Sequence, residues 1–255
     1  MLHELAAYRE AEDLLRQVLE IAGATIGVKP QEYATYLSNL GGALKAQKKF
    51  VEAEAFLRQA LQIVRTKFGE KHADHSKYLN NLGSVLIEQG QLAEAEALCR
   101  RSLEIDRATI GESHPQYAEH LDGLARVLKA RGQLTEAEAL SRQSLEIDRA
   151  TIGYNHPRYA RHLNVLAGVL KAQGRLKKAE ALLRQALETA RDTFGEFHPD
   201  YAIQLANLAD VLEAKGDLEA ANSLWAKALR ILRRAPRADH PLIADLEQKL
   251  AAHDS

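Results

Sequence analysis

Apolar residues recur at three- and four-residue steps along most of this 255-residue chain, and this spacing predicts amphipathic helices. In residues 114–130, one helical face would carry Tyr117, Leu121, Leu124, Ala125 and Leu128. After Gly132 the pattern resumes, and a second helical face would carry Leu134, Ala137, Leu140, Ser144 and Leu145. The two faces predict a pair of helices joined by a short turn.

Prolines and glycines mark the ends of these helices. Pro115 suits the first helical position, because its missing N–H would have no partner there. Gly153 follows the second helix, where a residue with positive φ can close the last turn. No segment shows the alternation of a strand. We therefore expect an all-α protein.

The helix pair repeats every 42 residues. Glycines and histidines keep this spacing in three sets: Gly27, Gly69, Gly111, Gly153 and Gly195; Gly90, Gly132, Gly174 and Gly216; and His72, His114, His156, His198 and His240. Residues 91–121 match residues 133–163 at all but seven positions. The period predicts an array of related units.

Small residues keep the same period and would let paired helices approach closely. They are Gly41, Gly83, Ala125, Ala167 and Ala209 in the first helices, and Ala53, Ala95, Ala137, Ala179 and Ala221 in the second. One pair cannot bury both of its faces alone. Successive pairs should therefore stack into a solenoid.

These residues resemble the tetratricopeptide repeat (TPR) signature, which appears here as Leu82-Gly83, Gly90, Ala95, Cys99 and Ser102-Leu103. The 42-residue period resembles the kinesin-light-chain-like subgroup, as do Leu-Asn-Asn-Leu at 79–82, Glu-Ala-Glu at 94–96 and Gly-x-x-His-Pro at 111–115. The resemblance implies a right-handed superhelical solenoid of antiparallel helix pairs, with about 12 helices.

A single TPR array would fill residues 1–255. We expect a partial repeat at 1–27 with only a second helix, and full repeats at 28–69, 70–111, 112–153, 154–195 and 196–237. A lone helix in 238–255 would begin at His240-Pro241. The incomplete first unit suggests either a segment of a longer repeat protein or a face that pairs with another copy.

Charge and hydropathy narrow the classes of partner. Lys and Arg number 34 and Asp and Glu 35, so the net charge of −1 creates no field for nucleic acid or an anionic membrane. No apolar run approaches the ~20 residues of a membrane span, and residues 1–4 do not open a signal peptide. We expect a cytoplasmic protein without nucleic-acid or membrane partners.

Catalytic and metal chemistry is not predicted. Nucleotide-binding glycine motifs and the Gly-x-Ser-x-Gly elbow do not occur. Histidines one period apart, including His120 and His162, should lie ~10 Å apart, too far for one metal ion with ligands at ~2 Å. Cys99 falls at a packing position and should be a buried thiol. The periodic carboxylates, such as Glu94 and Glu96 or Glu136 and Glu138, should lie on solvated faces. We expect no enzyme, no cofactor and no metal site.

The resemblance implies that the first helices line a concave, peptide-binding groove. The matching candidate residues are Asn39, Lys45, Lys77, Asn80, Asn81, Ser84, Asp122, Arg126, Lys129, Arg161, Asn164, Lys171, Asn207 and Asp210. Asparagine amides can bond the backbone of an extended peptide, and Lys or Arg can select acidic side chains. Gly123 and Val165 replace the asparagine of Asn39, Asn81 and Asn207 in the middle repeats.

We therefore predict a non-catalytic module that binds a peptide or protein segment, with a preference for acidic residues. Two alternatives stay open. One is a sensor or regulatory segment of a larger signalling or effector protein, whose catalytic part lies outside this chain. The other is a mainly structural array that associates with itself through its incomplete N-terminal repeat.

Overall fold

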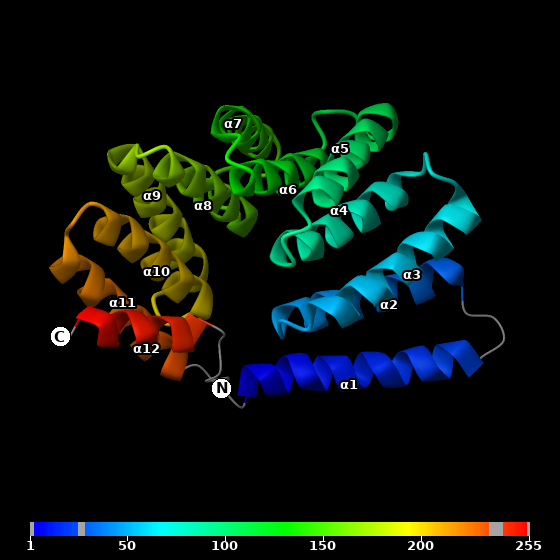
Figure 1. Ribbon diagram of the computed structural model, residues 1–255, viewed down its shortest axis with the longest axis horizontal. Coiled ribbons are helices and arrows are strands. Elements are labelled where there is room, and N and C mark those ends of the chain that lie inside the picture. The colour runs from blue at the N-terminus through cyan, green and yellow to red at the C-terminus, as the bar shows by residue number, and fades with distance from the viewer. Residues whose placement is uncertain (1–2, 25–28, 235–241, 254–255) are drawn as a thin grey trace. The chain divides into compact units, whose positions relative to one another are not determined.

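The computed structural model describes residues 3–24, 29–234 and 242–253, and it contains twelve helices and no strand in this part of the chain (Figure 1). They are α1 His3–Ala24, α2 Pro30–Ala46, α3 Phe50–Phe68, α4 Ala73–Glu88, α5 Leu92–Thr109, α6 Pro115–Ala130, α7 Leu134–Thr151, α8 Pro157–Ala172, α9 Leu176–Phe194, α10 Pro199–Ala214, α11 Leu218–Arg234 and α12 Leu242–His253. The predicted all-α array of helix pairs is confirmed. By register the even-numbered helices are first helices of a pair and the odd-numbered ones are second helices.

The periodic histidines and glycines stand at helix ends, as the sequence predicts. The Nδ1 atoms of His114 and His156 accept hydrogen bonds at 3.1 Å from the backbone N–H of Gln116 and Arg158, and so cap α6 and α8. Gly111 and Gly153 take φ values of 83° and 79° in the turns between pairs. Gly27 and the predicted helix start at His240-Pro241 lie outside the described residues.

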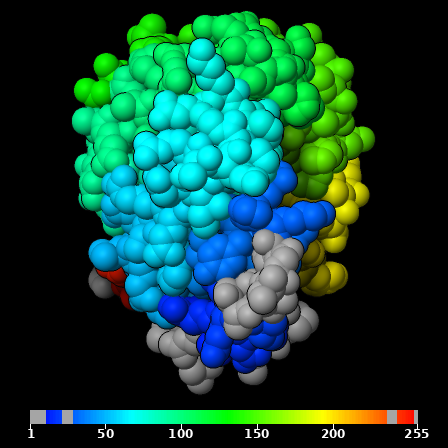
Figure 2. All heavy atoms as spheres, turned by 90° about the vertical axis from the view of Figure 1, so that its right-hand side faces the viewer, coloured from blue at the N-terminus to red at the C-terminus, as the bar shows by residue number. Residues whose placement is uncertain are grey.

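The chain divides into two compact units, residues 6–131 and residues 132–255 with 1–5. In the first, the N-terminal unit, α2 packs on α3 and α4 on α5, while α3–α4 and α5–α6 contacts join successive pairs. Figure 2 shows α2 to α5 of this unit side by side in chain order, from blue through cyan to green. In the second, the C-terminal unit, α7 to α12 each pack on the next helix, and Trp225 is fully buried in their shared core.

Close approach within a pair explains the periodic small residues. A Cβ at Gly41 would lie 2.7 Å from Cγ of Leu57, and one at Gly83 would lie 3.0 Å from Sγ of Cys99. Larger side chains would push α2 from α3 and α4 from α5. The glycines therefore fix how far a bulky residue of the second helix can reach into its partner.

The first helices of the N-terminal unit also touch one another. α4 contacts both α2 and α6 directly, whereas the second helices α3 and α5 make fewer contacts with each other. Side chains of successive first helices therefore meet on one side of this unit. We call the side formed by α2, α4 and α6 the first-helix face.

Candidate binding surface on the first helices

One predicted residue, Asn81, forms a polar contact across the first-helix face, and a second, Ser84, bonds to it within α4. The Asn81 amide on α4 donates from Nδ2 to Oγ of Ser38 on α2 at 2.9 Å, and Ser84 Oγ donates to the backbone carbonyl oxygen of Asn81 at 2.7 Å. Asn81 and Ser84 are both half-buried. The structure thus brings Asn81 and Ser84 together and links α4 to α2 through the Asn81 amide.

Gly123 makes room for the neighbouring asparagine. A Cβ at this glycine of α6 would lie 2.2 Å from Oδ1 of Asn80 on α4. The half-buried Asn80 amide therefore packs against α6 where the side chain of Gly123 is missing. Gly123, which stands where other repeats have an asparagine, thus makes room for Asn80 of the preceding helix pair. The sequence alone did not indicate this contact.

Three charged residues converge near the last turns of the first helices. Arg126 Nη2 on α6 lies 3.4 Å from Oε1 of Glu88 on α4. Lys45 on α2 is half-buried, and burial together with repulsion from Arg126 lowers its pKa to about 8, although Glu88 acts in the opposite direction. Glu88 therefore pairs with Arg126, and the charges of both act on Lys45.

The other candidates of the N-terminal unit differ in exposure. Asn39, Lys77 and Lys129 are exposed, whereas Asp122 is only 6% exposed. Since a side chain so deeply buried offers little surface to a ligand, Asp122 is the weakest of the predicted binding residues. The other three lie exposed on the first helices.

In the C-terminal unit the candidates lie on α8 and α10. Arg161 is exposed, while Asn164, Lys171 and Asn207 are half-buried. Asp210 accepts a hydrogen bond from Nε1 of Trp225 at 3.0 Å and one from Nζ of Lys249 at 2.6 Å, so it connects α10 to α11 and α12. The role of Asp210 in this structure is therefore to hold neighbouring helices.

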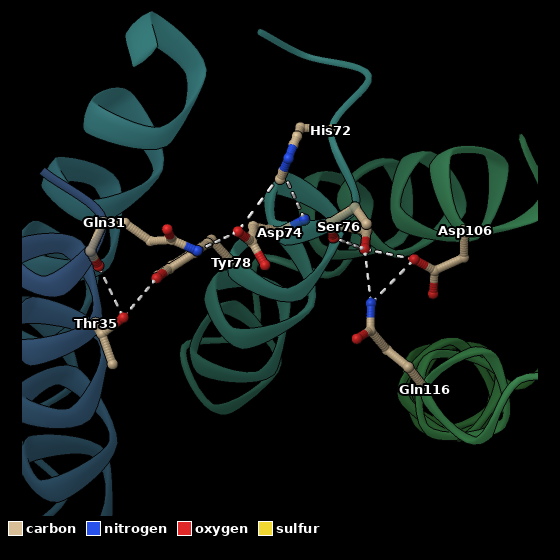
Figure 3. Close-up of polar contacts among 9 residues, drawn as sticks. Gln31, Thr35, His72, Asp74, Ser76, Tyr78, Asp106 and Gln116 are labelled. Atoms are coloured by element: carbon tan, nitrogen blue, oxygen red, sulfur yellow. Dashed lines mark hydrogen bonds and ion pairs between the residues drawn. The ribbon is translucent and has the colours of Figure 1, made fainter. Parts of the chain in front are cut away.

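A polar network that the sequence did not predict joins α2, α4, α5 and α6 (Figure 3). The Gln31 amide donates to Oδ2 of Asp74 at 2.6 Å. Ser76 Oγ donates to Oδ1 of Asp106 at 2.5 Å, and Gln116 Nε2 donates to the same carboxylate at 3.2 Å. These contacts attach each pair to the next.

Asp106 belongs to one of two buried aspartate–histidine pairs. His120 Nδ1 lies 2.5 Å from Asp106 Oδ2, and His162 Nδ1 lies 2.9 Å from Asp148 Oδ2. The four side chains are at most 2% exposed, so no substrate reaches them. The sequence does contain a signal for these pairs. In two repeats an Asp stands at a register position that is apolar in the others, where Val64, Ala190 and Leu232 lie, and a His follows on the next helix.

Asp148 has a charged partner, Arg158, at the register position where Asp106 has the neutral Gln116. Arg158 Nη2 donates to Oδ1 of Asp148 at 2.9 Å. Burial favours a raised pKa for Asp148, but the contacts with His162 and Arg158 outweigh it and lower the pKa. The buried carboxylate is therefore ionised at neutral pH and ties α7 to α8.

The expectation that the periodic glutamates are solvated holds for Glu94, whose side chain is 41% exposed, and for the exposed Glu136, but it is wrong for Glu96 and Glu138. The side chains of Glu96 and Glu138 are 13% and 16% exposed. Glu96 pairs with Arg100 and with Arg131 of the next turn, and Glu138 pairs with Arg175 at 2.5 Å. These carboxylates stabilise the junctions between repeats.

The structure confirms that Cys99 is a buried thiol. It is fully covered, and burial raises its pKa to about 12, so it stays protonated at neutral pH. In the described ranges no group of three or more His, Cys, Asp or Glu side chains could hold a metal ion. None of the helices described is both long and apolar enough to span a membrane.

The C-terminal unit has a hollow that sequence analysis did not indicate. It measures about 530 Å³ and lies at the turns around α8–α9 and α10–α11, lined by Gly174, Arg175, Leu176, Lys177, Lys178, Ala214 and Lys215. None of the predicted binding residues lines it.

Comparison with known proteins places the chain in a family. The tetratricopeptide repeat model matches residues 31–96, 74–150, 121–192 and 158–234. A search among curated proteins found no match. Many solved structures share the fold.

Three of these structures illustrate the likeness. Nearly identical TPR-like repeats of a kinesin-light-chain-type protein from Podosopora anserina are 24% identical, with 82% of this chain and 99% of that chain covered and a TM-score of 0.62. BtubC (BKLC) from P. vanneervenii is 21% identical over 93% of this chain and 92% of that chain, with a TM-score of 0.65. A thermophilic TPR protein from Thermus thermophilus is 21% identical over 86% of this chain and 97% of that chain, with a TM-score of 0.63.

At these identities the likeness concerns the fold alone. The family match, by contrast, extends over most of the helix pairs that the structure describes. The chain belongs to the tetratricopeptide repeat family, and its 42-residue repeats resemble in fold those of kinesin-light-chain-type proteins.

Proposed function

We propose that this TPR protein is a non-catalytic, cytoplasmic interaction module whose first-helix face binds an extended protein segment carrying acidic side chains. TPR proteins act as protein–protein interaction scaffolds, which supports the class of function. The finer proposal rests on the cluster of Lys45, Glu88 and Arg126.

The cluster has a surplus of positive charge in a partly dehydrated place. Glu88 pairs with Arg126, while the pKa of Lys45 falls to about 8 because burial and Arg126 disfavour its charged form. An incoming carboxylate would be the second counter-ion. It would raise the pKa of Lys45 again, so binding should take up protons and weaken as pH rises above about 8.

The amides on this face suit an extended backbone. Asn39 on α2 is exposed, and Asn80 and Asn81 on α4 are half-buried. An asparagine side chain offers both a donor and an acceptor, as a peptide backbone does. The amides would hold the chain of the ligand while the cations select its side chains.

A display library of random peptides, selected on the full chain, provides the probe. Enriched peptides should be rich in Asp and Glu, and the same peptides with Asn and Gln in their place should bind at least tenfold more weakly, since one charge-assisted contact is worth about 1.5 kcal/mol or more. Fluorescence anisotropy at two salt concentrations measures both affinities.

Charge reversal locates the site. Arg126→Glu with Lys129→Glu should weaken binding of the enriched acidic peptide at least tenfold. The control, Lys67→Glu with Lys71→Glu, makes the same change in net charge at exposed positions around the end of α3 and should stay within twofold. Equal affinity of both variants for the peptide would contradict the proposal.

A further inference from the structure

The outer surface of α1 is the first of two matching surfaces in this array. Leu14 is 54% exposed and Ile21 is 65% exposed, while Leu15 and Val18 between them are half-buried. One to five periods later, the residues in register with Leu14 and Ile21 are all at least half-buried. They are Phe56, Leu98, Leu140, Leu182 and Leu224, and Ile63, Ile105, Ile147, Thr189 and Ile231. In the complete pairs this side of a second helix is covered.

α12 presents the opposite surface. It is a first helix by register, and its Ala244 and Ala251 are exposed. The alanines one period earlier, Ala202 and Ala209 on α10, are 0% exposed. The same residue type at the same register is thus covered in a complete pair and uncovered on α12.

The two surfaces are complementary in register. In α2–α3 and α4–α5 the small residue of the first helix faces the residue sixteen positions later, Gly41 against Leu57 and Gly83 against Cys99. The residue that should face Ala251 would lie sixteen positions after it. Six periods of 42 residues before that position, the same register is occupied by Leu15 of α1. Leu15 is the half-buried leucine between the two exposed apolar residues.

We propose that α12 of one copy packs against α1 of a second copy, with Ala251 opposite Leu15, and so completes a TPR helix pair between the two molecules. The occupant is a second copy because this chain itself presents the small-residue surface that the register of α1 requires. The contact joins different surfaces of the two copies, so it can continue head to tail. It is independent of ligand binding on the first-helix face.

Disulfide trapping tests this contact. The background is Cys99→Ser, because the next repeat has a serine, Ser141, at this register position. In this background, Leu15→Cys and Ala251→Cys are made in separate full-length chains. Diamide, which takes up the two electrons and two protons of the thiols, oxidises an equimolar mixture. A disulfide-linked heterodimer should form much faster than in a mixture of Ala251→Cys with Val51→Cys, a cysteine at a 78% exposed position of α3.

Mass measurements give a second, non-covalent test. Sedimentation of the wild-type chain should show an average mass that rises with concentration above the 28.3 kDa of one copy. Ala251→Glu should abolish the rise, whereas Ala97→Glu, at an exposed alanine of α5, should leave it unchanged.

Three results would overturn the proposal. The first is a constant mass of one copy at all concentrations, and the second is equal crosslinking in the two mixtures. The third is an intramolecular disulfide in the doubly substituted chain without a heterodimer in the mixture, because the occupant of α1 would then be α12 of the same molecule.

Discussion

At the scale of single residues, Gly123 replaces the repeated asparagine of its own repeat and leaves space for the Asn80 side chain of the repeat before it. A Cβ there would lie 2.2 Å from Oδ1 of Asn80, whereas a Cβ at Gly42 would meet nothing within 4 Å. Both glycines lie inside helices, where alanine is preferred by about 1 kcal/mol. The difference between the two sites therefore isolates the Asn80 contact.

We predict that Gly42→Ala raises the free energy of unfolding by about 1 kcal/mol, while Gly123→Ala raises it by less, since the Asn80 amide must move. In an Asn80→Ala background Gly123→Ala should recover the full gain. Urea unfolding of the four chains in this cycle measures the coupling between residues 80 and 123. Additive effects of the two substitutions would show that Asn80 does not depend on the glycine.

At the scale of helices, the buried aspartates form ion pairs and hydrogen bonds that join one helix pair to the next. Asp148 on α7 holds Arg158 and His162 on α8, all three at most 18% exposed in their side chains. Removing one partner of a buried ion pair costs about 3–5 kcal/mol, because the other charge stays buried. The register equivalent of Arg158 is Gln116, which reaches Asp106 in the same way.

We predict that Asp148→Asn lowers the free energy of unfolding by about 3 kcal/mol, because Arg158 loses its counter-ion. Arg158→Gln should cost only about 1 kcal/mol, since it copies the neutral contact between Gln116 and Asp106. Chemical denaturation followed by circular dichroism compares the two variants. Equal losses would mean that the charge of Arg158 is essential at this junction.

The sequence predicted features within each helix and each repeat, but not the contacts between particular helices. The period, the helix ends and the small residues followed from the sequence, because each depends on neighbours along one helix or on a spacing repeated in every unit. The Asp106–His120 and Asp148–His162 contacts occur in only two junctions and join different helices, so an average repeat hides them. The first-helix residues could be placed on their helices from the resemblance, but the packing of Asn80 against Gly123 and the burial of Asp122 depend on distances between helices.

At the scale of the whole molecule, glutamates at one register position stabilise several junctions against acid. Burial favours a raised pKa for Glu12, but hydrogen bonds from Lys49, Arg16 and Gln47 outweigh it and lower the pKa from 4.5 to about 2. A hydrogen bond from Gln89 is the main cause that lowers the pKa of Glu54. Bonds from Arg142 and Lys215 do the same for Glu138 and Glu180.

These shifts predict an acid-labile array. A carboxyl whose pKa is lower in the folded than in the unfolded chain contributes stability above its ordinary pKa and loses it as pH falls toward the folded value. Because the side chains of Arg16 and Lys49 are about 40% exposed, solvent screens their pairs with Glu12, and each pair contributes about 1 kcal/mol or less. The free energy of unfolding should therefore fall steeply between pH 4.5 and about 2, where these glutamates become protonated.

Glu12→Gln separates this cause from general acid denaturation. The variant should be less stable than the wild type at pH 7, and the difference should shrink toward zero as pH approaches 2. Glu20→Gln, at an exposed position of the same helix, provides the matched control and should follow the wild-type curve. Urea unfolding at a series of pH values measures all three chains, and a Glu12→Gln curve parallel to that of the wild type would show that the ion pairs of Glu12 do not produce the pH dependence.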